Sequence, residues 1–345
     1  MVDSGVRILA IGGGTGLSTL LRGLKPYVER GGNWSVSHLS AIVTVSDEGG
    51  SSGVLRKELS ILPPGDVRNC IVALAEEELL LSRLFAYRFA GETPLHGHSL
   101  GNLLLAALTD ITGNFESAVL AASEVLAIRG EIYPSTLADV RVRALCSDGS
   151  VLIGETAISG DHFVGAPVPE HAPIVRVSID PADAEPLDRA LEAIERADMI
   201  VIGPGSLYTS ILPNLVIPRL GDALRKARAL RVYICNVMTQ PGETDGYSAA
   251  DHLKTIVDHT GLVADVVLIN GTRPSDAILA TYAAQRQYPV APDAERVREL
   301  GATPFFADVV AEQNFVRHDP AALAETVFRL YDRYGRRLRR IRRGK

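Results

Sequence analysis

The sequence predicts an α/β fold, a three-layer α/β/α Rossmann-like domain around a mostly parallel sheet, with a β-rich insertion. The apolar run at 6–11 leads directly into glycines and then into a helical pattern, which is typical of a strand, a tight turn and a helix. A second buried strand is expected at 39–45, and this spacing fits a parallel βαβ unit. Strands and helices alternate again from residue 183. We therefore expect one α/β domain over 1–332, with the insertion at about 131–180 and a basic tail at 333–345.

The first predicted strand ends in a glycine-rich loop made of Gly12, Gly13, Gly14, Thr15 and Gly16. Glycines let backbone N–H groups approach an anion, and the following helix N-terminus favours a phosphate. The loop does not match two standard patterns, because Leu17 stands where a dinucleotide fingerprint has its third glycine and no lysine follows as in a Walker A loop. A plain tight turn between strand and helix is the alternative.

Helices without intervening strands are expected after this first unit. The Pro-Pro-Gly-Asp turn at 63–66 predicts a helix with Asp66 as its N-cap, and helical patterns continue over 71–89 and 100–111. Asn114 is expected to cap another helix that runs to Leu126. These segments predict a helical section beside the sheet.

The middle of the chain has a β pattern, and the second half returns to α/β. Alternating runs on either side of the Ser-Asp-Gly-Ser turn at 147–150 predict a hairpin, followed by a strand at 174–179. Later segments are expected to be helices at 183–197, 248–259 and 275–287 and strands at 199–202, 231–235, 266–269 and 305–310. Asp319 and Pro320 predict the cap and first position of a last helix.

Four predicted strands end in loops rich in Gly, Ser, Thr, Asn and Asp, namely 12–18, 46–53, 203–210 and 236–248. In a parallel sheet such loops meet at one edge, where open α/β sheets bind ligands. They offer backbone amides and hydroxyls but few strong bases. This suits a phosphorylated, polyhydroxylated ligand such as a nucleotide or a nucleotide sugar.

Composition restricts the function classes. The 345 residues are 46% apolar and carry a formal charge of −6. A net negative charge argues against a general nucleic-acid binder. The tail at 333–345 has seven Arg, one Lys and no acid, so the rest of the chain carries −14. Cys70, Cys146 and Cys235 show neither metal spacing nor a disulfide framework, which fits a reducing cytoplasm. We expect no signal peptide and no membrane span.

Six motifs in order closely resemble the gluconeogenesis factor (YvcK-like) family, which shares a fold with the CofD-like 2-phospho-L-lactate transferases. Besides the glycine loop, they are Asp-Glu-Gly-Gly-Ser-Ser-Gly at 47–53, Pro-Pro-Gly-Asp-Val-Arg-Asn at 63–69, Gly-His-Ser-Leu-Gly-Asn at 97–102, Gly-Pro-Gly-Ser-Leu-Tyr-Thr-Ser at 203–210, and Asn-Val-Met-Thr-Gln-Pro-Gly-Glu-Thr-Asp-Gly-Tyr-Ser at 236–248. The resemblance covers about residues 6–325. It implies a cytoplasmic bacterial protein that binds UDP-N-acetylglucosamine and is needed for normal cell shape during gluconeogenic growth.

The resemblance also implies a set of ligand-binding residues. It supports the glycine loop as the phosphate loop, and Tyr282 and Arg317 as residues suited to sugar or diphosphate contact. The other candidates come from the motif loops: Asp47, Ser51, Ser52, Asp66, Asn69, His98, Asn102, Gly205, Ser206, Asn236, Thr239 and Asp245. Glu48 departs from the family, which usually has Asp there, and this weakens a metal role for the 47–48 pair. The basic tail is not a family feature.

Several of these side chains have a structural alternative. Asp47 can cap its loop rather than bind metal or ribose. Asp66 fits an N-cap better than a catalytic acid, and Arg317 can pair with Asp319. His252 and His259 are expected on a solvated helix face.

Three functions remain open on the sequence. The leading one is a nucleotide-sugar-binding regulatory protein without turnover, because no nucleophile–base pair is evident and no catalytic residue is assigned. The second is a CofD-type transferase that moves a 2-phospho-L-lactyl group from a guanosine diphosphate carrier to a deazaflavin, with Asp47 or Asp66 serving a metal or base role. The third is a nicotinamide-dependent oxidoreductase, which the incomplete glycine fingerprint disfavours. No metal ligand set is assigned, although a divalent metal could accompany the nucleotide. Protein partners in cell-wall regulation and a homo-oligomer stay open.

Overall fold

The computed structural model describes residues 5–29, 34–76, 80–91, 93–160, 170–312 and 316–335. Its centre is a sheet of seven strands in the order β10-β9-β8-β7-β1-β2-β3, and every neighbouring pair runs parallel. The strands are β1 (Val6–Gly12), β2 (Val36–Val43), β3 (Glu131–Pro134), β7 (Met199–Ile202), β8 (Leu230–Ile234), β9 (Val266–Asn270) and β10 (Thr303–Ala307). The predicted α/β class is confirmed.

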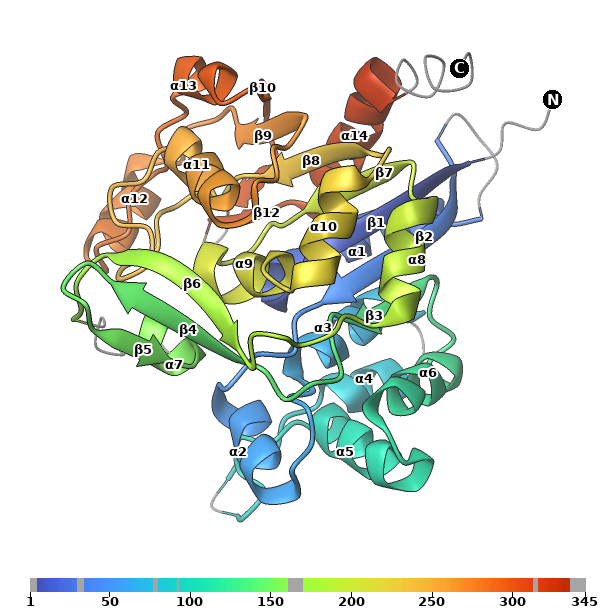
Figure 1. Ribbon diagram of the computed structural model, residues 1–345. Helices are drawn as coiled ribbons and strands as arrows, with labels where there is room; N and C mark the ends of the chain where they lie inside the picture. Colours follow the sequence, from blue (N-terminus) through green and yellow to red (C-terminus); the bar gives the residue numbers. More distant parts are fainter. Residues whose placement is uncertain are drawn as a thin grey trace.

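Helices cover both faces of this sheet (Figure 1). On one side α1 (Gly14–Leu24) packs against α3 (Gly65–Leu74) and α14 (Pro320–Leu330); on the other α8 (Asp188–Arg196) packs against α10 (Pro218–Lys226), and α11 (Ala249–Thr260) contacts β9. Sheets buried on both faces need near-continuous apolar strands. β7 meets this demand in full, because all four of its residues are buried.

The helical section lies below the sheet in Figure 1 and contains α2 (Gly50–Leu59), α4 (Leu80–Ala86), α5 (Leu100–Thr112) and α6 (Phe115–Val125). Ser99 and Asn114 cap α5 and α6 by accepting backbone N–H bonds, as expected for Asn114. The predicted N-cap role of Asp66 is wrong, because α3 begins at Gly65 with Pro64 as its N-cap. Among the described helices no single one is long and apolar enough to span a membrane; α5 and α6 pass that test only jointly, with a 120° bend between them.

The β-rich insertion forms a separate antiparallel sheet in the order β5-β4-β6, from β4 (Arg141–Cys146), β5 (Val151–Ile153) and β6 (Ile174–Asp180). The hairpin predicted at the Asp-Gly turn is therefore confirmed. The predicted start of the insertion at 131 is too early, because Glu131–Pro134 pairs parallel with β2 as the edge of the main sheet. A short helix, α7 (Glu155–Ser159), follows β5.

The C-terminal part adds elements that position the site. A π-helix (Leu207–Ile211) and α9 (Leu212–Leu215) follow β7, and α12 (Asp276–Ala283) and α13 (Ala294–Glu299) lie between β9 and β10. A hairpin of β11 (Val310–Glu312) and β12 (Val316–His318), absent from the sequence prediction, follows β10. Asp319 caps α14 through the Ala322 N–H with Pro320 at the first helical position, as predicted. A last π-helical turn covers Tyr331–Gly335, and the remainder of the predicted tail lies outside the described residues.

The order of strands reverses at β1. The chain leaves β1 towards β2 and β3 on one side and returns through β7, β8, β9 and β10 on the other. β1 and β7 are adjacent, and the chain continues from their ends towards opposite sides. The loops that follow these two strands therefore leave a crevice between them.

Candidate functional site

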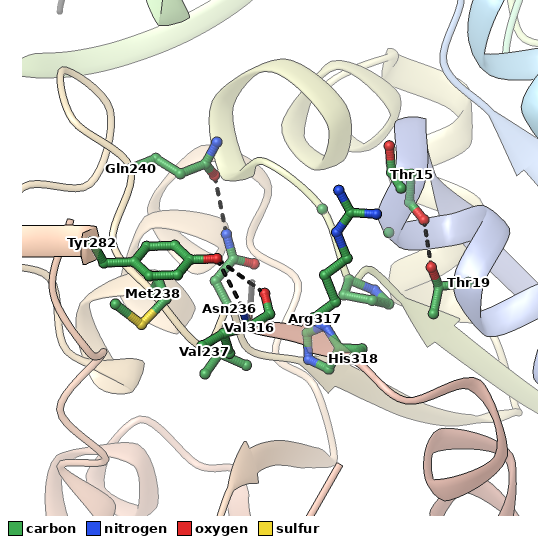
Figure 2. Close-up of a pocket in the computed structure, with 13 residues that line it drawn as sticks. Thr15, Thr19, Asn236, Val237, Met238, Gln240, Tyr282, Val316, Arg317 and His318 are labelled. Carbon is green, nitrogen blue, oxygen red and sulfur yellow. Dashed lines mark hydrogen bonds between the residues drawn. The ribbon is translucent and has the colours of Figure 1, made fainter. Parts of the chain in front are cut away.

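A cavity of about 300 Å³ opens at this crevice (Figure 2). Its wall contains six of the predicted site residues: Thr15, Gly16, Gly205, Asn236, Tyr282 and Arg317. They come from the first turn of α1, from the loops after β7 and β8, from α12 and from β12. The structure thus brings together motifs that are separated by about 300 positions of sequence.

The glycine loop is shaped by close approaches of the backbone. A Cβ on Gly16 would lie 2.3 Å from the Pro204 carbonyl oxygen, and one on Gly13 would lie 2.4 Å from Asp66 Oδ2. Gly14 has a φ of +62°, a left-handed conformation that side chains disfavour. Gly12 meets no such limit, since the nearest atom to its Cβ would be 3.7 Å away. The first turn of α1 consequently packs directly against the 203–205 loop.

This packing makes one end of the cavity suitable for an anion. Thr15 and Gly16 lie in the first turn of α1, which carries the positive end of the helix dipole. Arg317 extends from β12 towards the same region in Figure 2 and adds a guanidinium, which pairs well with phosphate oxygens. The N-terminal turn of α1 and the Arg317 guanidinium therefore both favour phosphate at this end.

The other end carries an aromatic ring and amides. The Tyr282 hydroxyl donates to the Val316 carbonyl (3.3 Å) and accepts from the Val316 N–H (3.1 Å), which fixes the ring beside Met238 (Figure 2). Asn236 Nδ2 donates to Gln240 Oε1 at 3.2 Å, and Asn236 Oδ1 is buried with no partner among the described residues. A ring held in place and an unused buried acceptor suit a flat ligand with polar edges.

His318 was missed by the sequence analysis, although it lines the same cavity next to Arg317. Burial lowers the pKa of His318 to about 4, so its imidazole is neutral at pH 7. Its Nε2 is buried and has no partner among the described residues. Only the β11–β12 hairpin brings it to the cavity, and neither strand is longer than three residues.

A second group of predicted residues lies around Gly13 and the start of α2 rather than in the cavity. Ser51 Oγ contacts His98 Nδ1 at 3.0 Å and accepts from Asn102 Nδ2 at 3.2 Å. Asp47 Oδ1 accepts the Gly49 N–H at 2.7 Å, which is the loop-capping alternative considered for it. Ser52 and Asp66 complete this group, whereas Asn69, on α3, accepts a hydrogen bond from the neighbouring Arg68 at 2.6 Å.

Asp66 is the electrostatic centre of this second group. Burial raises the pKa of Asp66 well above its usual value, and the nearby carboxylates of Asp47 and Glu155 raise it further, whereas the Gly14 N–H and Arg68 act in the opposite direction. The Asp66 carboxyl therefore takes up a proton more readily than an exposed aspartate does. The described residues contain no group of three or more His, Cys, Asp and Glu that could hold a metal ion.

The last three candidates have other surroundings. Ser206 donates to Glu243 Oε2 at 2.5 Å, and Thr239 is buried with its hydroxyl accepting the Tyr288 N–H at 3.0 Å. Asp245 is exposed and accepts the Gly242 N–H at 2.6 Å, so it shapes a turn beside the cavity rather than its wall. The structure therefore gives Thr239 and Asp245 local structural contacts.

The expectation that His252 and His259 lie on a solvated helix face is wrong. His252 is fully buried, and His259 Nε2 accepts the Val177 N–H of β6 at 2.9 Å. Burial lowers the pKa of both imidazoles. The spacing of Ala249, His252 and Ile256 on α11 follows the buried stripe of the helix and could have revealed this.

Comparison with known proteins agrees with this architecture. The family model described as 2-phospho-L-lactate transferase CofD matches residues 8–310. The gluconeogenesis factor of Halalkalibacterium halodurans is 47% identical over 322 residues, covering 93% of this chain and 95% of the relative. The gluconeogenesis factor of Bacillus subtilis is 46% identical over 321 residues, covering 92% and 96%.

A solved structure shows the same fold. The crystal structure of a Bacillus halodurans protein superposes with a TM-score of 0.85 at 46% identity and covers 94% of this chain and 99% of that chain. A match of this extent and identity, together with the family model over most of the chain, establishes common ancestry. The chain therefore belongs to the CofD family and, within it, to the gluconeogenesis factors.

Proposed function

We propose that this chain is a cytoplasmic regulatory protein that binds a UDP-sugar, with UDP-N-acetylglucosamine the favoured ligand, and that it supports cell shape during gluconeogenic growth. The observation that carries the proposal is the division of one cavity into two ends. Thr15, Gly16 and Arg317 suit a diphosphate, while Tyr282 and Asn236 suit a flat base with polar edges. A nucleoside diphosphate has both parts, joined in that order.

The wall of the cavity also supports binding without turnover. Its polar side chains are Thr15, Thr19, Asn236, Gln240, Tyr282, Arg317 and His318, and among the residues that the structure describes the wall includes no carboxylate or cysteine. Hydrolysis or transfer of a sugar nucleotide usually relies on a positioned general base or a nucleophile. His318 is the only imidazole among the described residues of this wall, and a pKa lowered to about 4 by burial makes it a weak proton acceptor.

Calorimetric titration of the full chain with UDP-N-acetylglucosamine, UDP, GDP and NAD tests the proposal. We expect the UDP compounds to bind and to raise the melting temperature, because a ligand specific for the native state stabilises it. Long incubation with the sugar nucleotide followed by product analysis should recover it intact. Release of UDP or free sugar that an Asn236→Ala variant abolishes would make the protein an enzyme and overturn the regulatory proposal.

The second group of polar residues favours one alternative, a CofD-type transferase. Asp47 and Asp66 are two carboxylates next to the phosphate loop, and Mg²⁺ is often held by one or two carboxylates together with substrate phosphates. Such an ion would supply electrophilic stabilisation of a transferring phosphoryl group. In that case GDP should bind only with Mg²⁺, and Asp66→Asn should abolish the metal dependence. Metal-independent binding of UDP compounds would favour the regulatory function.

A further inference from the structure

Three side chains form a hydrogen-bonded series from the cavity into the loop after β8. Asn236 Nδ2 donates to Gln240 Oε1 at 3.2 Å, and Gln240 Nε2 makes a longer contact of 3.5 Å to Glu243 Oε1 (Figure 2 shows the first two residues). Glu243 is buried, with 4% of its surface exposed. The series therefore links a buried carboxylate to the wall of the proposed nucleotide site.

Glu243 is fixed by donors from three other positions. Ser159 Oγ of α7 donates to Oε1 at 2.8 Å, Ser206 Oγ donates to Oε2 at 2.5 Å, and the Tyr208 N–H donates to Oε2 at 3.3 Å. A carboxylate can only accept hydrogen bonds, and here both oxygens face donors. Glu243 thus acts as a fixed hydrogen-bond acceptor for the side-chain amide of Gln240.

The Glu243 carboxylate determines the orientation of the side-chain amides of Gln240 and Asn236. If the Gln240 amide were reversed, its oxygen would face the carboxylate oxygen of Glu243 and the two acceptors would repel. Gln240 must therefore point Nε2 at Glu243 and Oε1 at Asn236. Asn236 must then give its own Nδ2 to Gln240, which leaves Oδ1 as the group offered to a ligand. This Oδ1 is the atom that is buried without a partner.

We propose that Glu243 acts through Gln240 as a positioning residue, so that Asn236 selects a base whose central ring nitrogen on the Watson–Crick edge, N3 of a pyrimidine or N1 of a purine, carries a hydrogen. The inference rests on the proposed nucleotide-binding function and adds the rule by which the base is chosen. Uracil has a donor at N3, whereas cytosine has an acceptor at N3. Guanine and adenine differ in the same way at N1. An acceptor facing Asn236 Oδ1 would leave both groups unsatisfied, which is costly in a buried site.

The test compares nucleoside diphosphates in pairs of equal size. Titration of the wild-type chain should show UDP binding at least about tenfold more tightly than CDP, and GDP more tightly than ADP whenever purines enter the cavity, because each poor partner leaves a buried acceptor unpaired. Equal affinities for UDP and CDP would overturn the base rule while leaving the proposed function intact. Failure of all four diphosphates and of UDP-N-acetylglucosamine to bind would instead overturn the proposed function itself.

Two variants test the role of the series. Glu243→Gln replaces the fixed acceptor by an amide that can also donate, and Gln240→Met keeps the length of the side chain but removes its amide. In both, Asn236 is free to turn, and the UDP-to-CDP affinity ratio should fall towards one. Arg317→Ala should weaken UDP and CDP equally and leave the ratio unchanged, which separates base choice from phosphate binding.

Glu195→Gln is the matched control, because it makes the same chemical change on the exposed side of α8, outside the cavity. It should bind UDP and CDP as the wild type does. If Glu243→Gln fails to fold, Gln240→Met decides the question. A folded Gln240→Met that keeps the wild-type ratio would overturn the proposed series.

Discussion

Glu48 Oε2 lies where a side chain on Gly154 would begin, since a Cβ built on Gly154 would be only 1.7 Å from it. Glu48 extends from the loop after β2 to the insertion, and its Oε1 lies 3.5 Å from Arg56 Nη1 of α2 and 3.4 Å from Arg141 Nε of β4. The sequence analysis noted Glu48 as a departure from the usual Asp of the family. The side chain connects the main domain to the hairpin β4–β5.

Gly154→Ala should therefore be more destabilising than a glycine substitution elsewhere in the hairpin. Gly149 is the matched control, because its φ of +85° resembles the +89° of Gly154 while its Cβ would meet nothing within 4 Å. Both variants place a side chain at positive φ, and at Gly154, where ψ is 159°, the backbone lies in a region that is almost restricted to glycine. We expect Gly154→Ala to cost about 1 kcal/mol more, because the Glu48 carboxylate must swing aside and lose its ion pairs with Arg56 and Arg141. Urea unfolding monitored by circular dichroism measures the difference, and equal losses would contradict it.

Arg317→Ala should weaken UDP-N-acetylglucosamine binding with little effect on the unliganded fold. A charge-assisted hydrogen bond to phosphate contributes about 1.5–3 kcal/mol, which is on the order of tenfold to a hundredfold in affinity. An exposed arginine adds little to folding, so the melting temperature without ligand should stay near that of the wild type. Calorimetric titration is the measurement. Unchanged affinity would remove Arg317 from the site.

Two glycines of the same loop should respond in opposite ways. Gly16→Ala places a Cβ 2.3 Å from the Pro204 carbonyl oxygen, so α1 must move away from the 203–205 loop. Gly12→Ala meets its nearest atom at 3.7 Å, an ordinary contact. We expect Gly16→Ala to lose at least about tenfold in UDP affinity through the misplaced helix terminus, and Gly12→Ala to bind normally. A Gly16→Ala variant with wild-type affinity would show that this close approach does not shape the site.

The contact between α11 and the insertion should make stability sensitive to acid. His259 Nε2 accepts the Val177 N–H at 2.9 Å, which requires a neutral imidazole at that nitrogen. Burial lowers the pKa of His259 in the folded state, so its contribution is complete above the unfolded pKa of about 6.5 and is lost as the pH falls below it. The free energy of unfolding should therefore drop between pH 7.5 and 5.5.

A His259→Gln variant isolates this contribution, because glutamine can accept the same N–H but does not titrate. The raised pKa of Asp66 acts in the opposite direction, yet it is common to both proteins and cancels in the comparison. We expect urea unfolding to show a shallower pH dependence in His259→Gln than in the wild type. Identical slopes would mean that the imidazole is protonated without loss of the contact.

The central sheet could be predicted because its strands carry their signal locally. The run from Val6 to Ile11 is apolar and buried except at Arg7, and burial on both faces of a sheet demands such a pattern. β3 was assigned to the insertion instead, because Glu131–Pro134 is a four-residue edge strand with a glutamate at its start. Only its pairing with β2 places it in the main sheet.

The sequence indicates which loops contribute to the site, but not which of their side chains lie in the same cavity. Asn236 and Arg317 could be proposed from family motifs, whereas Asp47 and His98, chosen in the same way, lie in the second group around Gly13. Two loops at one sheet edge can face opposite sides of the helix that separates them, and sequence spacing does not encode the side. The role of Gln240 was missed for a similar reason, since the direction of its amide is set by a carboxylate that contacts two other segments.

The central position of β1 has a consequence for biosynthesis. β1 lies between β2, which follows it closely, and β7, which begins at Met199. A ribosome that adds about 5–20 residues per second needs on the order of 10–40 s to proceed from the end of β1 to β7. Throughout that interval β1 lacks its β7 partner and exposes an apolar strand edge, the kind of surface that pairs with other chains. The same strand order that forms the ligand crevice thus makes the half-synthesised protein a candidate client for chaperones that shield unpaired strands.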